Sequence, residues 1–262
     1  MRVIANGRGL VVGFEKINLN DFPNLEVLGC NVTSLEHLSW DEINHRGIKV
    51  ISLRDYPEFL KKITSTAEHT IGLIIALLRN YKIALNPPYQ DREKYKGHTL
   101  QNKRLGLIGG KGRVGKQVER MALGLGMDIS TYDKTKSFWT RDINWTLDEV
   151  LLLSDIISIH IPLDGNEGFF DREMFLKMKS TAYLVNTSRS GVIEAEDLIW
   201  ALENTIIKGA AIDFTDDPAL VEYAKIHNNL ILTPHLGGCT HEDMQATENF
   251  IIKKTQAYLD VF

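Results

Sequence analysis

The segment Leu105–Asp133, LGLIGGKGRVGKQVERMALGLGMDISTYD, decides the fold of this chain. It opens with the apolar run Leu105–Ile108, which is typical of a buried strand. The pattern GxGxxG follows at Gly110–Gly115, and apolar residues then recur at helical spacing. A second strand-like run, Met127–Tyr132, ends next to Asp133. A strand, a glycine-rich turn, a helix and an acid about 20 residues further on are typical of a βαβ unit that binds a dinucleotide.

Each part of this segment has an expected task. Gly110 allows the tight turn, Gly112 lets a pyrophosphate approach the backbone, and Gly115 lets the helix pack close to the sheet. The helix that begins near Arg113 directs N–H groups and the positive end of its dipole at the phosphates. Asp133 is expected to bind the adenine ribose hydroxyls and to repel a 2′-phosphate, which favours NAD over NADP. The alternative is a glycine-rich strand–helix turn without a ligand.

The bulk properties are those of an ordinary globular enzyme. The chain has 262 residues, 44% of them hydrophobic and 24% charged, which is enough for one large or two modest domains. A net charge of −4 without a basic stripe argues against a non-specific nucleic-acid binder. Cys30 and Cys239 have no metal-binding or redox spacing, so we expect no metal and a reducing, cytoplasmic compartment. We expect no signal peptide, and the apolar run Ile71–Leu78 is too short to span a membrane.

Strands and helices alternate along most of the chain, and Asn86–Gln101, with its Pro87–Pro88 pair, is the best linker candidate. Strands such as 156–161 are almost continuously apolar, as expected when helices cover both faces of a parallel sheet. The sequence therefore predicts an α/β fold with a doubly wound parallel sheet, that is, a Rossmann domain. The expected elements are strand 25–30, helix 35–46, strand 48–53, helix 65–81, strand 105–109, helix 113–125, strand 127–132, helix 146–153, strand 156–161, helix 171–179, strand 182–187, helix 194–204, strands 207–213 and 230–233, and helix 241–259.

Polar segments follow the predicted strands at the carboxyl edge of the sheet, where such sheets bind ligands. They read HIPL at 160–163, NTSRSG at 186–191, DFTDDP at 213–218 and TPHLGG at 233–238. An arginine, a carboxylate and a histidine thus emerge at successive strand ends beside the dinucleotide site. Arginine binds a carboxylate through its planar fork, histidine transfers a proton, and a carboxylate orients the imidazole. This set suits hydride transfer to a carbonyl that stands next to a carboxylate.

These motifs, together with STAEHT at 65–70 and TSLEHL at 33–38, resemble the D-isomer-specific 2-hydroxyacid dehydrogenase family, which includes phosphoglycerate dehydrogenases. The resemblance extends from about Val3 to about Leu259. It implies an NAD-binding domain at 81–239 and a smaller, flavodoxin-like substrate domain formed by 1–80 and 240–262. Met1–Arg8 is interpreted as a late strand of that second domain, which would leave a truncated unit of three strands.

The resemblance also implies the roles of individual residues. Arg189 would bind the substrate, His235 would be the acid and base, and Asp217 would orient the histidine. Asn31, Val32 and Thr33 would bind the substrate together with Arg189, and the protein would be a homodimer. The residues expected to bind NAD are Gly110, Gly112, Arg113, Val114, Gly115, Asp133, His160, Ile161, Pro162, Thr187, Ser188, Arg189, Asp213, His235, Gly237 and Gly238.

Three departures from the family pattern leave an alternative open, and the truncated N-terminal unit is one of them. Asp217 stands where the family usually has a glutamate, in a segment one residue tighter than the common pattern. The substrate loop after Gly29 lacks the usual glycines. The main hypothesis is an NAD-dependent oxidoreductase for a small D-2-hydroxy acid and its 2-oxo acid. The alternative is a catalytically weak NAD(H)-binding sensor or scaffold of the same fold. His37 and His69 are expected to be structural.

Overall fold

The computed structural model describes residues 1–85, 92–134 and 145–261, and the chain forms two compact units. Unit 1 comprises Met1–Ile63 and Cys239–Phe262, and unit 2 comprises Thr64–Gly238. The first boundary lies after Ile63 rather than near residue 80, because helix α3 (Ser65–Leu78) packs its apolar side chains in the core of unit 2. The first part of the predicted linker, residues 86–91, lies outside the described residues.

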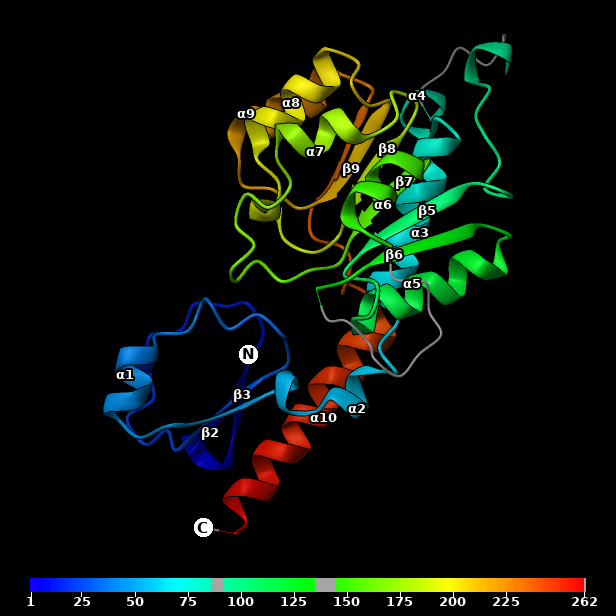
Figure 1. The fold of residues 1–262 in the computed structure, drawn as a ribbon. Helices are drawn as coiled ribbons and strands as arrows, with labels where there is room; N and C mark the ends of the chain where they lie inside the picture. The colour runs from blue at the N-terminus through cyan, green and yellow to red at the C-terminus, as the bar shows by residue number, and fades with distance from the viewer. Residues whose placement is uncertain (86–91, 135–144, 262) are drawn as a thin grey trace. The chain divides into compact units, whose positions relative to one another are not determined.

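Unit 2 contains a six-stranded sheet in the order β10-β9-β8-β7-β5-β6, and all neighbouring strands are parallel (Figure 1). The doubly wound Rossmann fold is therefore confirmed. The order reverses between β5 and β7, and such a switch point is where open parallel sheets bind ligands. The strands are β5 (Arg104–Ile108), β6 (Asp128–Tyr132), β7 (Ile156–Ile159), β8 (Tyr183–Asn186), β9 (Gly209–Asp213) and β10 (Leu230–Thr233).

Helices cover both faces of this sheet. The core on one face contains α3 and α5 (Arg113–Gly124), and the core on the other contains α6 to α9. Helix α9 was not predicted from the sequence, because its first residues follow Asp217 and were interpreted as part of the site. The remaining helical segments of the unit are α4 (Tyr81–Ala84), α6 (Leu147–Leu153), α7 (Arg172–Lys177), α8 (Ala195–Glu203), α9 (Pro218–Ile226), and the 3-10 turns η4 (Arg92–Tyr95) and η5 (Ser190–Val192).

Unit 1 contains a sheet in the order β1-β2-β3-β4, in which β2 to β4 are parallel and β1 is antiparallel. The prediction of one strand over residues 1–8 and of three strands in all is wrong. Ala5, Asn6 and Gly7 have positive φ and turn the chain back, so that β1 and β2 form a hairpin. The strands are β1 (Arg2–Ile4), β2 (Gly9–Val12), β3 (Val27–Cys30) and β4 (Lys49–Ser52).

The C-terminal helix α10 (His241–Leu259) closes one face of the unit 1 sheet, and a second apolar cluster lies on the other face. The approach of α10 is close, because a Cβ atom at Gly29 would lie 2.4 Å from Thr255 Oγ1 and 2.7 Å from Ile251 Cγ2. The remaining helical segments are α1 (Trp40–His45), α2 (Pro57–Leu60), η1 (Ala5–Gly7), η2 (Leu19–Asp21) and η3 (Leu53–Asp55). The predicted helix at 35–46 is thus shorter and begins at Trp40.

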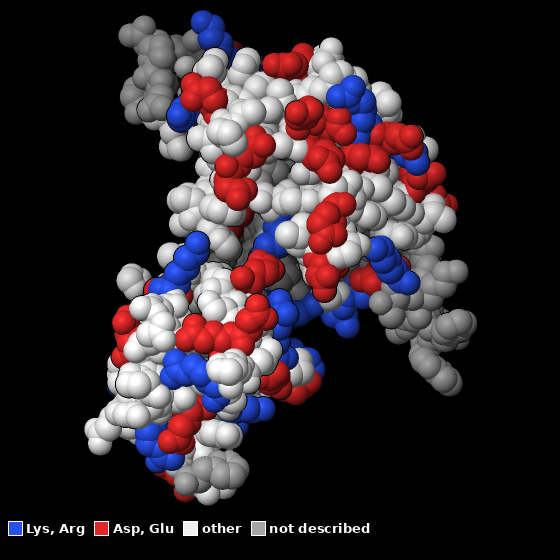
Figure 2. Space-filling model, turned by 90° about the vertical axis from the view of Figure 1, so that its left-hand side faces the viewer, with Lys and Arg blue, Asp and Glu red and all other residues white. Residues whose placement is uncertain are grey.

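Acidic and basic side chains are interspersed over the face drawn in Figure 2. None of the helices within the described ranges has the length and apolar character needed to cross a membrane.

We expect Gly29→Ala to destabilise the protein by ~1–3 kcal/mol, because the new methyl group would overlap α10. Gly72→Ala is the matched control. It lies in α3 with nothing within 4 Å of the added Cβ, so it should stabilise the helix by ~0.5–1 kcal/mol. Urea denaturation followed by circular dichroism measures both free energies of unfolding. Equal stability of Gly29→Ala and wild type would contradict the close packing of β3 on α10.

Candidate functional site

The glycine-rich turn after β5 is built around Gly109 rather than Gly110. Gly109 has a φ of +80°, and a Cβ there would lie 2.5 Å from the carbonyl oxygen of His160. The assignment of the tight turn to Gly110 is therefore wrong, although Gly110 has no room for a side chain beside Thr131 either. A Cβ at Gly115 would lie 2.6 Å from Gly110 Cα, so this glycine lets α5 approach the turn itself.

This turn leads directly into helix α5. Gly112 is the N-cap residue of α5, and Arg113, Val114 and Gly115 form its first turn. The first N–H groups of a helix have no carbonyl partner within the helix and point at whatever lies before it. A Cβ at Gly112 would lie 3.2 Å from the Gly109 carbonyl oxygen, so the turn that precedes these N–H groups is built of closely packed backbone, and such a helix start fits a pyrophosphate. The Lys111 N–H donates to Asp133 Oδ2 at 3.2 Å, which holds the carboxylate next to the turn as predicted.

His160 lies at the end of β7, next to the glycine-rich turn, and is followed by Ile161 and Pro162. Its Nε2 is 2.9 Å from Ser158 Oγ. Burial lowers the pKa of His160 to about 4, so the imidazole is neutral at physiological pH. This histidine therefore contributes shape and a hydrogen bond rather than a charge.

Asn186 organises the loop that carries Arg189, a task that the sequence did not reveal. Its Oδ1 accepts hydrogen bonds from Ser188 N at 2.9 Å and from Ser188 Oγ at 2.6 Å, and its Nδ2 donates to the Arg189 carbonyl at 2.8 Å. The hydroxyl oxygens of Thr187 and of Thr70 in α3 are 2.8 Å apart. The loop after β8 is thus fixed from the sheet side and from α3.

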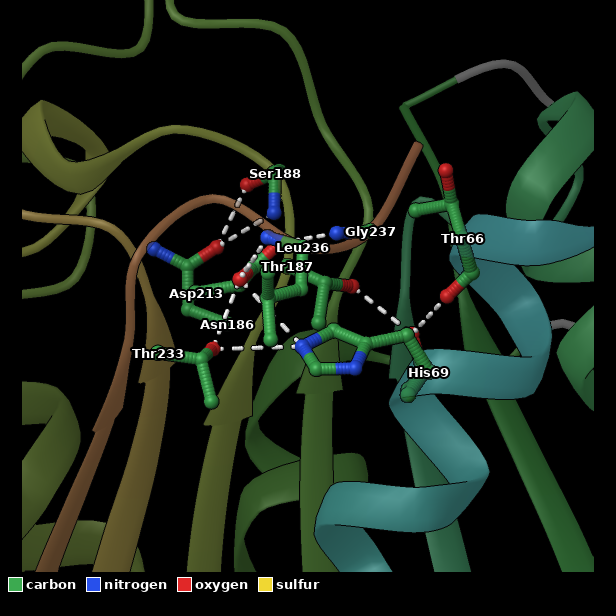
Figure 3. A network of polar contacts seen from close by, with 10 residues as sticks. Thr66, His69, Asn186, Thr187, Ser188, Asp213, Thr233, Leu236 and Gly237 are labelled. Carbon is green, nitrogen blue, oxygen red and sulfur yellow. Dashed lines mark hydrogen bonds and ion pairs between the residues drawn. The ribbon is translucent and has the colours of Figure 1, made fainter. Parts of the chain in front are cut away.

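Asp213, the last residue of β9, is buried and accepts several hydrogen bonds (Figure 3). Thr233 Oγ1 and Leu236 N donate to Oδ1 at 2.6 and 2.7 Å, and Gly237 N donates to Oδ2 at 2.7 Å. His69 Nε2 of α3 lies 3.2 Å from Oδ1. Burial alone raises the pKa of Asp213, but these hydrogen bonds together lower it to about 2. The carboxylate is therefore ionised and fixed.

His235 lies in the loop that Asp213 holds. Its backbone has a φ of +62°, and its ring stacks on Phe214, whose φ is +91°, with 5.5 Å between ring centroids. Such backbone conformations are costly for residues other than glycine and are frequent at functional sites. Partial burial lowers the pKa of His235, the negative charge of Asp213 raises it, and the positive charge of Arg189 lowers it further. Arg189, Asp213 and His235 are thus close enough to interact, although the carboxylate expected to act on the histidine was Asp217.

The structure gives Asp217 a different task from the predicted one. It is the N-cap of α9, and its Oδ1 accepts a hydrogen bond from Leu220 N at 2.9 Å. Its own N–H donates to Thr215 Oγ1. The geometry therefore favours Asp213 over Asp217 as the carboxylate that acts on His235.

The predicted substrate loop belongs to unit 1 and follows β3. Asn31 N donates to the Val12 carbonyl, and Arg54 Nε donates to the Thr33 carbonyl. Asn31 Oδ1 and both ring nitrogens of His37 are buried without a hydrogen-bond partner among the described residues. Polar atoms of this kind are costly unless a ligand or water satisfies them. Arg54 and His37 were not among the residues predicted to bind the substrate. Arg54 contacts the loop at Thr33, and the ring of His37 packs near Phe14, and no local sequence pattern indicates either contact.

Comparisons with known proteins agree with this arrangement. Residues 71–237 match the family model described as D-isomer specific 2-hydroxyacid dehydrogenase, NAD binding domain. The chain belongs to the D-isomer specific 2-hydroxyacid dehydrogenase family. It is 32% identical over 235 residues to a D-3-phosphoglycerate dehydrogenase of Bacillus subtilis. The aligned region covers 85% of this chain and 43% of that protein.

Two further proteins can be aligned with nearly the whole of this chain. A glyoxylate reductase of Pyrococcus furiosus is 30% identical over 257 residues, covering 90% of this chain and 73% of the relative. The crystal structure of D-lactate dehydrogenase from Aquifex aeolicus, complexed with NAD and lactic acid, has the same fold. Its TM-score is 0.77 at 24% identity, covering 97% of this chain and 83% of that one. The chain spans less than half the length of the phosphoglycerate dehydrogenases of B. subtilis and Methanocaldococcus jannaschii.

The low pKa of His160 predicts a pH dependence of stability. The folded protein binds this proton only below about pH 4, whereas the unfolded chain binds it near pH 6.5. Between these values the unfolded state holds more protons, so stability falls on acidification, by up to about 1.4 kcal/mol per pH unit from this group. We expect His160→Gln to reduce this loss between pH 6.5 and 4.

Urea unfolding at a series of pH values measures the effect. His227→Gln, which changes an exposed histidine of unit 2, is the control and should retain the wild-type slope. An unchanged slope in His160→Gln would contradict the neutral state of the half-buried His160.

Proposed function

We propose that this protein is an NAD-dependent dehydrogenase that interconverts a small D-2-hydroxy acid and its 2-oxo acid. The observation that carries the proposal is the group Arg189, Asp213 and His235. Their charges interact at the carboxyl edge of the unit 2 sheet, the edge at which the glycine-rich turn follows β5. Membership of a family of 2-hydroxyacid dehydrogenases supports the same chemistry.

The cofactor would be held by the backbone at Gly109–Gly115 and by the side chain of Asp133. The N–H groups at the start of α5 would bind the pyrophosphate, and the Asp133 carboxylate would bind the adenine ribose. Thr187, Ser188 and the loop at Gly237–Gly238 would line the nicotinamide side. When bound, NADH supplies the hydride that reduces the carbonyl carbon.

Arg189 and His235 would act on the substrate. The guanidinium would bind the carboxylate and the carbonyl oxygen through its planar fork. His235 would donate a proton from its imidazole to the forming alkoxide during reduction and would remove it during oxidation. The loop Asn31–Thr33 is the proposed second substrate-binding element. Asn31 Oδ1 is buried without a partner among the described residues and, as an acceptor, would receive a hydrogen bond from a ligand hydroxyl group rather than bind a carboxylate.

A second candidate function is an NAD(H)-binding sensor or scaffold with weak catalysis. Asp217 favours it, because a carboxylate that caps α9 is engaged in a structural task at the position where the family usually has the glutamate that orients the histidine. Asp217 remains a proposed orienting residue for His235, a role with which its capping hydrogen bond to Leu220 N competes. A homodimer and a cytoplasmic location are further proposals from the resemblance and from the cysteine content.

The first test measures NADH oxidation with glyoxylate, pyruvate, hydroxypyruvate, phosphohydroxypyruvate and 2-oxoglutarate. His235→Ala should reduce kcat by roughly 10²–10⁴-fold with unchanged NADH affinity, because the variant lacks the proton donor. Arg189→Ala should lower kcat and raise KM together. His241→Ala changes an exposed histidine at the start of α10 and is the control. Tight NADH binding without turnover on any acid would favour the sensor or scaffold instead.

The second test concerns the choice between NAD and NADP. Asp133→Ser should weaken NADH binding about tenfold or more and improve the relative affinity for NADPH, because a charged hydrogen-bond acceptor and a repulsive charge are both lost. Fluorescence titration with each cofactor measures this. Asp128→Ser, at the opposite end of β6, should leave both affinities unchanged. If Asp133→Ser leaves the ratio of affinities unchanged, Asp133 does not contact the ribose.

A further inference from the structure

We propose that His69 of α3 is a positioning residue that acts through Asp213 on the loop carrying His235. This inference rests on the proposed function as far as catalysis is concerned. The effect of His69 on Asp213 and on the loop of His235 depends only on contacts within unit 2. His69 was expected to be structural, and Figure 3 shows its ring directed from α3 toward the ends of β9 and β10.

The hydrogen-bond network determines which way His69 acts. The Thr233 hydroxyl donates to Asp213 Oδ1 at 2.6 Å, so its proton is already engaged. His69 Nε2 lies 3.2 Å from that hydroxyl oxygen and 3.2 Å from Asp213 Oδ1, both of which can only accept here. His69 therefore carries a proton on Nε2 and donates it to both oxygens.

Asp213 transmits this contact to His235. Oδ1 and Oδ2 accept the N–H groups of Leu236 and Gly237, the two residues that follow His235. The backbone at His235 is held at a positive φ, a conformation that persists only when its surroundings fix it. An Asp213 side chain that turned away would release these N–H groups and move its charge relative to the imidazole.

Helix α3 is itself well anchored, which makes it a suitable support. The Thr70 hydroxyl of α3 donates to the Thr66 carbonyl and lies 2.8 Å from Thr187 Oγ1. One helix thus contacts the residues at or after the ends of β8, β9 and β10. The charged groups that act on His235 from these elements are Asp213 and Arg189, and His69 is the third titratable side chain in the network.

The experiment compares His69→Leu, which removes the donor, with His69→Gln, whose amide nitrogen can take the place of Nε2. NMR measures the pKa of His235 and the exchange rates of the Leu236 and Gly237 amides without substrate. We expect His69→Leu to lower the pKa of His235 by ~0.5–1 unit and to speed exchange of both amides by about tenfold or more, because Asp213 loses a donor. His69→Gln should restore both values, and His227→Gln should change neither.

Kinetics then connect the network to the reaction. Reduction needs protonated His235, so kcat/KM falls as the pH rises through its pKa, and in His69→Leu this fall should occur at lower pH. Should the leucine variant fail to fold, His69→Asn, with an amide too short to reach Asp213, takes its place. Wild-type amide exchange and pKa in His69→Leu would overturn the inference, as would a glutamine variant that behaves like leucine. The expected NMR changes without any 2-oxo acid turnover by wild type would support the positioning role and reject the proposed function.

Discussion

The carboxylate of Asp213 is the group on which the arrangement of unit 2's site depends. A buried carboxylate is costly unless hydrogen bonds satisfy it, and Asp213 accepts them from β10, from the loop after β10 and from α3. These donors come from segments that are distant in the sequence but converge at one sheet edge. The ionised oxygen atoms therefore hold strand ends, loop and helix in register, and the strained backbone at His235 follows from that constraint.

Much of unit 2 could be predicted because a parallel sheet covered on both faces produces continuous apolar runs. The strands at 105–109, 156–161 and 182–187 were found in this way, each within about two residues of β5, β7 and β8. Unit 1 was less predictable. The turn at Ala5–Gly7 depends on positive φ at residues that include an alanine, and the apolar pattern alone did not separate β1 from β2.

The site shows the same division between local and long-range information. Arg189 and His235 could be predicted to lie near each other, because residues at the carboxyl ends of parallel strands meet at one edge. The carboxylate that acts on His235 was expected to be Asp217, whereas the structure has Asp213 there. The tight turn was assigned to Gly110 because the motif begins there, although the positive φ occurs at Gly109, where the His160 carbonyl also leaves no room for a Cβ atom. The contact of His69 with Thr233 joins residues 164 positions apart, and no local pattern specifies such a pair. The capping of α9 by Asp217 was not predicted, because Asp217 had been assigned to catalysis.

The path of the chain through the two units has a consequence for biosynthesis. Unit 2 is a continuous segment inserted between the two parts of unit 1, and the helix that closes one face of the β1–β4 sheet is made after all strands of both units. Unit 2 therefore has all of its strands before unit 1 has its final helix. Until α10 leaves the ribosome, Val11, Val27 and Ile51 lack the apolar side chains of that helix that cover them in the native protein. During this interval the nascent chain exposes an apolar sheet face. Intermediates with exposed apolar surface tend to aggregate and are bound by chaperones.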